Sequence, residues 1–206
     1  MRISDHRYHR DVRKYNLAMR LIHHEARTGT IRRWTGLSGR CIRNLFRSYA
    51  HDQVEGRAAR HRGPSPHMVE LLLQSSQMRA DVALLTSVFC LLDLIPLRPL
   101  PSVRREPPNI SRGEQMCTAF ETFRALVPDS NVTLEHAFLL VATLIHGKSL
   151  GLGKCECCGA LIVIDFRGEV GQTCGLCSDT LDAEDTKSVA RLILNRRRNM
   201  LLPNEP

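Results

Sequence analysis

Two pairs of cysteines near the C-terminal end of the sequence have the spacing of a metal site. Cys155 and Cys158 enclose two residues, Cys174 and Cys177 enclose two more, and fifteen residues separate the pairs. Each C-x-x-C turn presents two thiolates to one ion, and two such turns complete a tetrahedron with Zn–S distances of about 2.3 Å. The spacing therefore predicts one structural Zn²⁺ per chain. Four thiolates would leave no coordination position at which the ion could activate water.

The residues around these cysteines are typical of a zinc ribbon. Residues 161–164 are strand-like in composition, and residues 167–171 can turn the chain back toward the second cysteine pair. Gly159 and Gly175 stand where a metal-binding turn needs permissive backbone and N–H groups that face sulfur. We expect a small zinc-ribbon-like module with a four-cysteine site over residues 149–180.

The role of Cys157 and the chemistry of the thiols leave alternatives open. Cys157 could replace Cys155 or Cys158 as a ligand, although the C-x-x-C spacing fits both pairs and makes Cys157 a spare thiol. Disulfide or redox chemistry is the other use of such cysteines, and the adjacent positions of Cys157 and Cys158 disfavour it. The other cysteines lie on apolar helical faces and are expected in the core: Cys41, Cys90 and Cys117.

The expected cellular compartment bears on the state of these thiols. The first 13 residues carry four arginines and no apolar stretch, so they do not resemble a signal peptide. The most apolar run, residues 82–96, contains Asp93 and is shorter than the roughly 20 apolar residues that span a bilayer. We therefore expect a cytoplasmic protein without membrane contact, whose cysteines are reduced or bound to metal.

The charge of the 206-residue chain favours a polyanionic partner. Its formal net charge is +8, and four thiolates with one divalent ion would leave about +6. A basic surface of this kind attracts nucleic acid first and anionic membranes second. Hydrophobic residues make up 43% of the chain, which is enough to form a packed core.

Apolar residues recur at helical spacing through most of the chain before the cysteines, which predicts a mostly α fold. In the first half of the chain, helices are expected over residues 14–27, from about residue 30, through residues 42–46 and over residues 67–95. Two more are expected after residue 108. One runs from a capping box at Ser111–Glu114 to Val127, and the other runs from a cap at Ser130 or Asn131 to His146. Non-helical connections are expected over residues 50–67 and 96–108. The expected organisation is a helical domain over residues 1–148, the module over 149–180 and a basic tail over 181–206.

Residues 26–49 predict a helix-turn-helix-like segment in the N-terminal part of the helical domain. Gly36 falls in the turn, and Ser38 can cap the second helix. That helix would turn Ile42, Leu45 and Phe46 inward and present outward Arg40, Arg43, Asn44 and Arg47. Arginine and asparagine suit guanine and adenine edges, and arginine also suits phosphates. The alternative is a helical hairpin whose arginines form a solvated face.

The C-terminal tail contains three more candidates for contact with double-stranded DNA, Arg196, Arg197 and Arg198. A basic tail can supply phosphate contacts that do not depend on base sequence. A solvated tail without a ligand is the alternative interpretation.

The sequence argues against an enzyme. It contains no P-loop, nucleophile elbow or H-E-x-x-H motif. The triplet 23–25 (His-His-Glu), taken with Cys155 and Cys158, is similar to part of a zinc deaminase site. However, Lys154 replaces the expected proline, the separation is too long, and the second cysteine pair already completes the metal site. Ordinary helical roles are expected for His23, His24, His136 and His146.

The cysteine module resembles that of the flagellar transcriptional activator FlhC family. The likeness is strongest in Leu152-Gly-Lys-Cys-Glu-Cys-Cys-Gly159 and in Val170-Gly-Gln-Thr-Cys-Gly-Leu-Cys177. Weaker similarity extends over residues 14–180, through segments that include Leu17–Ile22, Gly36–Ser38, Arg62–Pro64 and Phe89–Cys90.

Several properties follow from this resemblance as expectations. FlhC-like proteins are mostly helical with a C-terminal zinc site, and the family's zinc ligands map onto Cys155, Cys158, Cys174 and Cys177. They act with FlhD in a hetero-hexamer of four FlhD and two FlhC chains, in which FlhC is the main DNA-binding subunit. The complex binds upstream of flagellar promoters and recruits RNA polymerase.

The sequence therefore predicts a DNA-binding transcriptional activator subunit. The alternative is a zinc-stabilised protein–protein adaptor without sequence-specific DNA binding, whose basic charge would serve an acidic partner.

Overall fold

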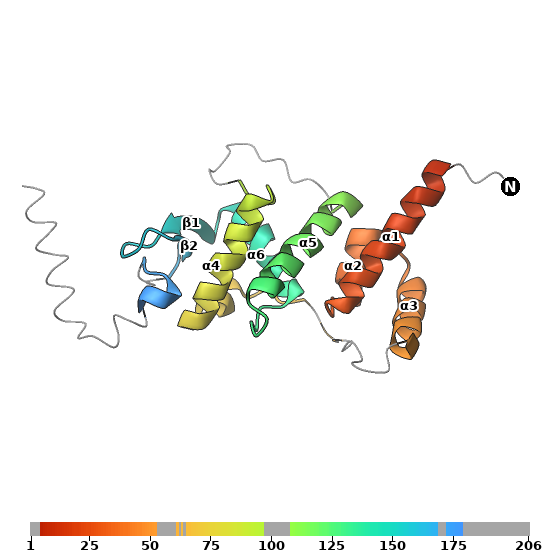
Figure 1. Ribbon diagram of the computed structural model, residues 1–206, viewed down its shortest axis with the longest axis horizontal. Helices are drawn as coiled ribbons and strands as arrows, with labels where there is room; N and C mark the ends of the chain where they lie inside the picture. Colours follow the sequence, from red (N-terminus) through yellow and green to blue (C-terminus); the bar gives the residue numbers. More distant parts are fainter. Residues whose placement is uncertain are drawn as a thin grey trace, which may run out of the picture.

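The computed structural model describes residues 5–52, 61, 63, 65–96, 108–168 and 172–178. Within these residues the chain is mostly helical, as predicted. Along the chain the elements are α1 (Asp5–His23), α2 (Thr28–Thr35), α3 (Gly39–Asp52), the 3-10 helix η1 (Val69–Leu73), α4 (Ser76–Leu91), α5 (Ile110–Leu126), α6 (Leu134–His146), β1 (Leu150–Lys154) and β2 (Leu161–Asp165). Figure 1 shows α1, α2 and α3 at one end of an elongated molecule, α4, α5 and α6 in its middle, and the β1–β2 hairpin at the other end.

The three N-terminal helices pack around a shared apolar centre. Helix α1 begins at Asp5 rather than near residue 14, because no glycine or proline interrupts the polar residues before its apolar face. Leu17, Leu21 and Ile31 are fully buried where α1 meets α2. Helix α1 contacts both α2 and α3, so the three helices form one unit.

The connection between α2 and α3 follows the predicted signals. Gly36 ends α2 in the left-handed conformation, with φ of 71°, and its N–H donates to the carbonyl of Arg32. A residue with a side chain would be strained there, so glycine is the natural C-terminal residue. The Ser38 hydroxyl then accepts a hydrogen bond from the Cys41 N–H at 3.2 Å and caps α3, as expected.

Two of the predicted helix caps are wrong. Helix α5 is capped by Asn109, whose side chain accepts from the Arg112 N–H at 2.8 Å, so Ser111 lies inside the helix. Helix α6 is capped by Thr133, which forms a reciprocal capping box with His136. The Ser130 hydroxyl lies ahead of α6, where it donates to the buried carboxylate of Asp81 at 2.6 Å and accepts from the Val132 N–H at 3.2 Å.

The predicted helical region 67–95 forms two elements of different kinds. Its first part is the short 3-10 helix η1, and its second part is α4, which Ser75 caps by accepting from the Met78 N–H. Helix α4 is buried along most of its length, as its apolar composition predicted.

The hairpin of β1 and β2 packs on the helices through one face. The strands are antiparallel, with Leu152 opposite Val163. Leu150 and Val163 are buried in the same apolar cluster as the helices, and β2 contacts α4. Strand β2 was predicted; β1 was not, because its sequence Leu-Gly-Leu-Gly-Lys has low strand propensity. Its glycines leave room for the side chains of Ile164 and Phe166.

Polar and aromatic contacts join the N-terminal helices to α5 and α6. Glu121 of α5 accepts from Arg20 and lies 3.0 Å from the His24 imidazole of the α1 end. Trp34 of α2 stacks on Phe138 of α6, with ring centroids 4.9 Å apart. These contacts hold the N-terminal unit against the middle of the molecule.

Several predictions from the sequence lie outside the described residues. They are the basic tail with Arg196, Arg197 and Arg198, and most of the expected connections over 50–67 and 96–108. The expected division at residues 148 and 180 stays a prediction.

The position of the α5 cap can be tested by a matched pair of substitutions. We expect Asn109→Ala to lower the free energy of unfolding by about 1 kcal/mol, because the substitution removes the hydrogen bond to the first turn of α5. Ser111→Ala, also on an exposed residue, should change it by less than about 0.5 kcal/mol. Urea denaturation of the metal-loaded protein measures both, and the opposite ranking would restore Ser111 as the cap.

Candidate metal centre

Four cysteines converge at the end of the molecule formed by the hairpin. The sulfur atoms of Cys155, Cys158, Cys174 and Cys177 all lie within 4.8 Å of one another. Cys158 Sγ and Cys174 Sγ are 3.8 Å apart, which matches the edge of about 3.8 Å expected for a tetrahedron with Zn–S distances of about 2.3 Å. The predicted set of four therefore comes together, and it fits one metal ion.

The first cysteine pair lies on the turn that connects the two strands. Cys155 directly follows β1, and its N–H donates to the Ala160 carbonyl at 2.8 Å. Gly159 donates back to the Cys155 carbonyl at 2.9 Å and has φ of 75°. This closed turn needs a left-handed residue, so the expectation of permissive backbone at Gly159 is confirmed.

The second cysteine pair is built around a single helical turn, residues 175–178: Cys174 directly precedes the turn and Cys177 lies within it. The N–H of Cys174 points at Cys155 Sγ, at 3.2 Å, and the N–H of Cys177 points at Cys174 Sγ, at 3.4 Å. Backbone N–H groups that face sulfur stabilise thiolates and orient them as ligands. The two turns are thus joined through hydrogen bonds to sulfur.

Gly175 serves a purpose different from the one predicted. It does not adopt a left-handed conformation; instead, a Cβ atom at this position would collide with the backbone carbonyl of Ser76, at the start of α4. Ser178, three residues on, accepts a hydrogen bond from Arg79 of α4 at 2.8 Å. Close packing on α4 therefore requires glycine at this position. The sequence around Gly175 could not have indicated this contact, because Ser76 lies about 100 residues earlier in the chain.

The electrostatics of the four thiols favour a bound cation. Burial acts to raise the pKa of Cys155, but N–H groups of Cys158, Cys174 and Cys157 outweigh it and lower that pKa to about 6. The Cys177 pKa is raised by hydrogen bonds with the Cys174 and Cys158 sulfurs. The hydrogen bonds thus favour the thiolate form of Cys155 and the protonated form of Cys177 when no ion is bound. A divalent cation would balance these charges.

Cys157 lies beside the four-cysteine group and is not part of it. Its side chain is exposed, and none of the eight cysteines, all of which lie among the described residues, is in a disulfide bond. Partial desolvation and the nearby Cys155 sulfur raise the pKa of Cys157. Its role as a spare thiol stays a prediction.

The remaining cysteines lie in the helical part of the molecule. Cys90 and Cys117 are buried, as expected for small core residues, whereas Cys41 is half-buried and its thiol lies 3.7 Å from the Tyr15 hydroxyl. Burial raises the pKa of Cys117 to about 12, so this thiol is protonated and inert near neutral pH.

Helix α3, which carries the candidate DNA-contacting residues, lies at the opposite end of the molecule from the β1–β2 hairpin (Figure 1). All four are exposed: Arg40, Arg43, Asn44 and Arg47. On the opposite side of α3, Ile42 is fully buried, and Leu45 and Phe46 pack against the core. The predicted inward and outward faces of this helix are therefore those of the structure.

The histidines considered for catalysis do not join the metal centre. Among the described residues, the group of potential metal ligands contains four cysteines and no histidine. His24 instead contacts Glu121, and His136 belongs to the cap of α6. The resemblance of residues 23–25 to a deaminase motif thus has no counterpart in the arrangement of these side chains.

No protein-family model matches the chain, and no curated protein matches it. Within the part of the chain that the structure describes, no helix has both the length and the apolar character needed to cross a membrane.

The assignment of the ligands predicts how single substitutions change the metal content. We expect Cys174→Ser to lose the bound metal, because Cys174 is buried and its sulfur lies close to the other three. Cys157→Ser should keep one ion per chain. Elemental analysis of the purified variants measures this, and loss of metal from Cys157→Ser would show that the ligand set is wrong.

The low pKa of Cys155 gives the metal site a defined response to acid. Above about pH 6 this thiol is already ionised in the folded protein, and below it the metal must displace a proton. We therefore expect the affinity for the metal to fall more steeply with acid below about pH 6 than above it, by about one further factor of ten per pH unit. Competition with a chromophoric chelator across a pH series measures it, and a slope that does not change near pH 6 would argue against Cys155 as a ligand.

Proposed function

We propose that this protein is the DNA-binding subunit of a bacterial transcriptional activator, similar to FlhC, with a structural Zn²⁺ in its C-terminal module. The observation that carries the proposal is the distribution of charge. Residues 5–52, which form α1, α2 and α3, contain eleven arginines and lysines and four acidic residues, a net charge of +7 out of +8 for the whole chain. Charge concentrated in one unit is typical of a surface that binds nucleic acid.

The exposed face of α3 has the chemistry for reading DNA. Its four polar residues occupy positions i, i+3, i+4 and i+7 of the helix, which places them on one side in a stripe about 10 Å long. They are Arg40, Arg43, Asn44 and Arg47. Three base pairs of B-DNA rise by about the same distance. Arginine can form paired hydrogen bonds with guanine, and asparagine with adenine, in the major groove. Exposed Arg32 and Arg33 of α2 would add contacts to phosphates.

The metal module supports a structural ion rather than a catalytic one. Paired C-x-x-C turns and four sulfur ligands favour Zn²⁺. Four thiolates fill its coordination sphere, so we propose that the protein is not an enzyme and works in the reducing cytoplasm. The ion would hold the hairpin and the 175–178 turn against α4.

The partners in this proposal come from the resemblance of the cysteine module. They are an FlhD-like subunit in a hetero-hexamer and RNA polymerase at flagellar promoters. A second candidate, a protein–protein adaptor, is favoured by two exposed apolar side chains of the C-terminal module: Leu176, between the cysteines of the second pair, is 71% exposed, and Phe166, just after β2, is 60% exposed. Such side chains suit contact with another protein.

The role of α3 can be tested by removing two charges from its exposed face. We expect the double variant Arg43→Ala/Arg47→Ala to bind a flagellar promoter duplex at least about tenfold more weakly, since one arginine contact contributes about 1–3 kcal/mol. Fluorescence anisotropy across a salt series, with and without a co-expressed FlhD-like partner, measures the affinity. Arg167→Ala, which removes one exposed charge just after β2, should have little effect.

Each outcome decides between the candidates. Binding that sharpens with the partner and weakens in the double variant supports the activator. Unchanged affinity of the double variant removes α3 from the contact surface. If metal-loaded protein binds no DNA at any salt concentration, the adaptor becomes the better proposal.

A further inference from the structure

The side chain of Arg79, on the first turn of α4, attaches the second cysteine pair to that helix. Its Nη2 group donates a hydrogen bond to Ser178 Oγ at 2.8 Å. The Ser178 hydroxyl donates to the Gly175 carbonyl at 2.8 Å, and the Ser178 N–H donates to the Cys174 carbonyl at 3.0 Å. Ser178 therefore closes the helical turn that contains Cys177, and Arg79 holds the closed turn against α4.

Backbone packing adds to this hydrogen bond at the same place on α4. A Cβ atom at Gly175 would come within 1.9 Å of the Ser76 carbonyl oxygen and within 2.9 Å of the Ala80 nitrogen. Ser76, Arg79 and Ala80 are spaced i, i+3 and i+4, so they share one side of the helix. This side of the start of α4 is the support of the second cysteine pair.

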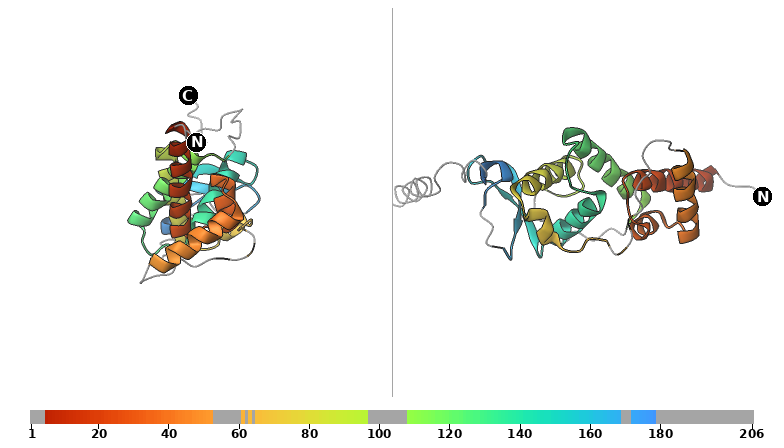
Figure 2. Two further views of the ribbon diagram at one scale, coloured as in Figure 1. Left: turned by 90° about the vertical axis from the view of Figure 1, so that its right-hand side faces the viewer. Right: turned by 90° about the horizontal axis from the view of Figure 1, so that it is seen from below.

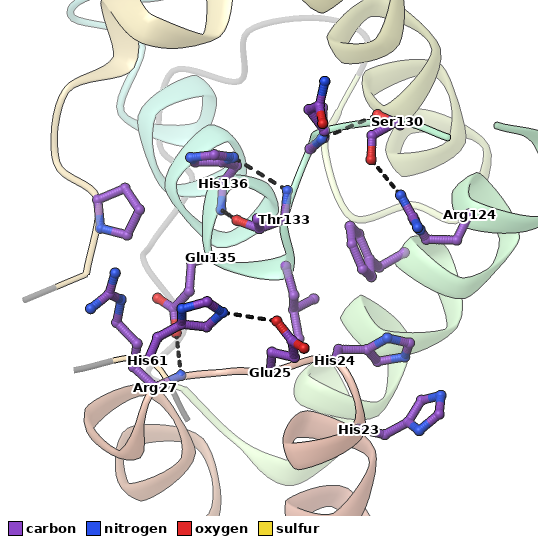
Figure 3. A pocket seen from close by; sticks show the side chains of 15 residues that line it. His23, His24, Glu25, Arg27, His61, Arg124, Ser130, Thr133, Glu135 and His136 are labelled. Carbon is purple, nitrogen blue, oxygen red and sulfur yellow. Dashed lines mark hydrogen bonds and ion pairs between the residues drawn. The ribbon is translucent and has the colours of Figure 1, made fainter. Parts of the chain in front are cut away.

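The start of α4 is itself fixed through the buried carboxylate of Asp81. One carboxylate oxygen accepts from Gln77 Nε2 at 2.8 Å, and the other accepts from the Ser130 hydroxyl at 2.6 Å. Arg124 of α5 donates to the Ser130 carbonyl, and these two residues line a cavity together with Arg27 (Figure 3). Because α4 is bound in this way to α5 and to the segment before α6, it offers the cysteine turn a firm support.

The guanidinium group of Arg79 has an incomplete set of partners. Its Nε–H is buried without a hydrogen-bond acceptor, and among the described residues Arg79 forms no ion pair with a carboxylate. A partly buried cation is more stable beside negative charge. Four thiolates with one divalent ion carry about −2, and the segment that Arg79 contacts contributes the thiolates of Cys174 and Cys177. Arg79 therefore suits the metal-bound centre better than a centre of neutral thiols.

We propose that Arg79 is a positioning residue of the metal centre: it holds Cys174 and Cys177 in the arrangement that receives the ion. Without this hydrogen bond the ion has to order the turn on binding, which lowers its affinity. In return, the bound ion keeps Ser178 against Arg79 and stabilises the start of α4. This inference rests on the four-cysteine metal site of the proposed function and does not involve DNA.

The substitution Arg79→Met tests this role, because methionine keeps the apolar stem and removes both the hydrogen bond and the charge. Full-length protein loaded with Co²⁺ absorbs light through its cobalt–thiolate bonds, so competition with EDTA, followed by absorption, measures the affinity. We expect Arg79→Met to bind Co²⁺ at least about tenfold more weakly. Ser178→Ala, which removes the acceptor and leaves the charge, should also weaken binding. The double variant should bind no more weakly than Arg79→Met, because both changes remove the same contact.

Arg112→Met is the matched control. Arg112 is also half-buried, and it donates a hydrogen bond to the Leu94 carbonyl at 2.6 Å, beyond the other end of α4. We expect this variant to keep the affinity for Co²⁺ and to lower the Tm equally with metal and with excess EDTA. Arg79→Met should lower the Tm more with metal than without it, because a change in affinity appears only in the metal-bound state.

The outcomes separate the role of Arg79 from the existence of the metal site. If the unaltered protein does not bind Co²⁺, the metal centre itself is wrong, and the inference fails with it. If the unaltered protein binds Co²⁺ and both single variants bind it equally well, only the role of Arg79 is overturned. An equal loss of Tm with and without metal in Arg79→Met, at unchanged affinity, also overturns it. Should Arg79→Met fail to fold, the affinity of Ser178→Ala decides.

Discussion

The burial of α4 is the constraint on which the other parts of the structure depend. Val82, Leu85 and Phe89 are completely buried, and α5, β2 and η1 all pack against this helix. Its N-terminal turn receives the second cysteine pair, where Gly175 meets Ser76. Because one helix serves as the core of the helical part and as the support of the metal centre, a change at either place is transmitted to the other.

Much of this arrangement could be predicted from local sequence. The spacing of Cys155, Cys158, Cys174 and Cys177 indicates a metal site because two short turns are enough to bring the sulfurs together. Gly36, Ser38 and Gly147 mark helix ends through their own backbone or side-chain chemistry. The faces of α3 follow from helical periodicity alone.

The features that could not be predicted depend on contacts between distant residues. Ser130 lies outside α6, and its hydroxyl donates to Asp81, a residue 49 positions earlier in the chain. Strand β1 forms from a glycine-rich sequence because β2 and the helices supply the packing that its own residues lack. The cavity lined by Arg27 and Arg124 likewise could not be predicted from the sequence, because its walls come from distant segments that only folding brings together.

The separation of charge along the chain has a consequence for how the molecule moves. Residues 53–206 contain as many acidic as basic residues, so almost the whole excess of positive charge belongs to the N-terminal unit. That unit forms one end of an elongated body (Figure 2). Such a molecule has a large dipole moment along its long axis, and the field of a polyanion exerts a torque on it before contact. Such a field would turn the N-terminal helices toward the polyanion and the cysteine module away from it.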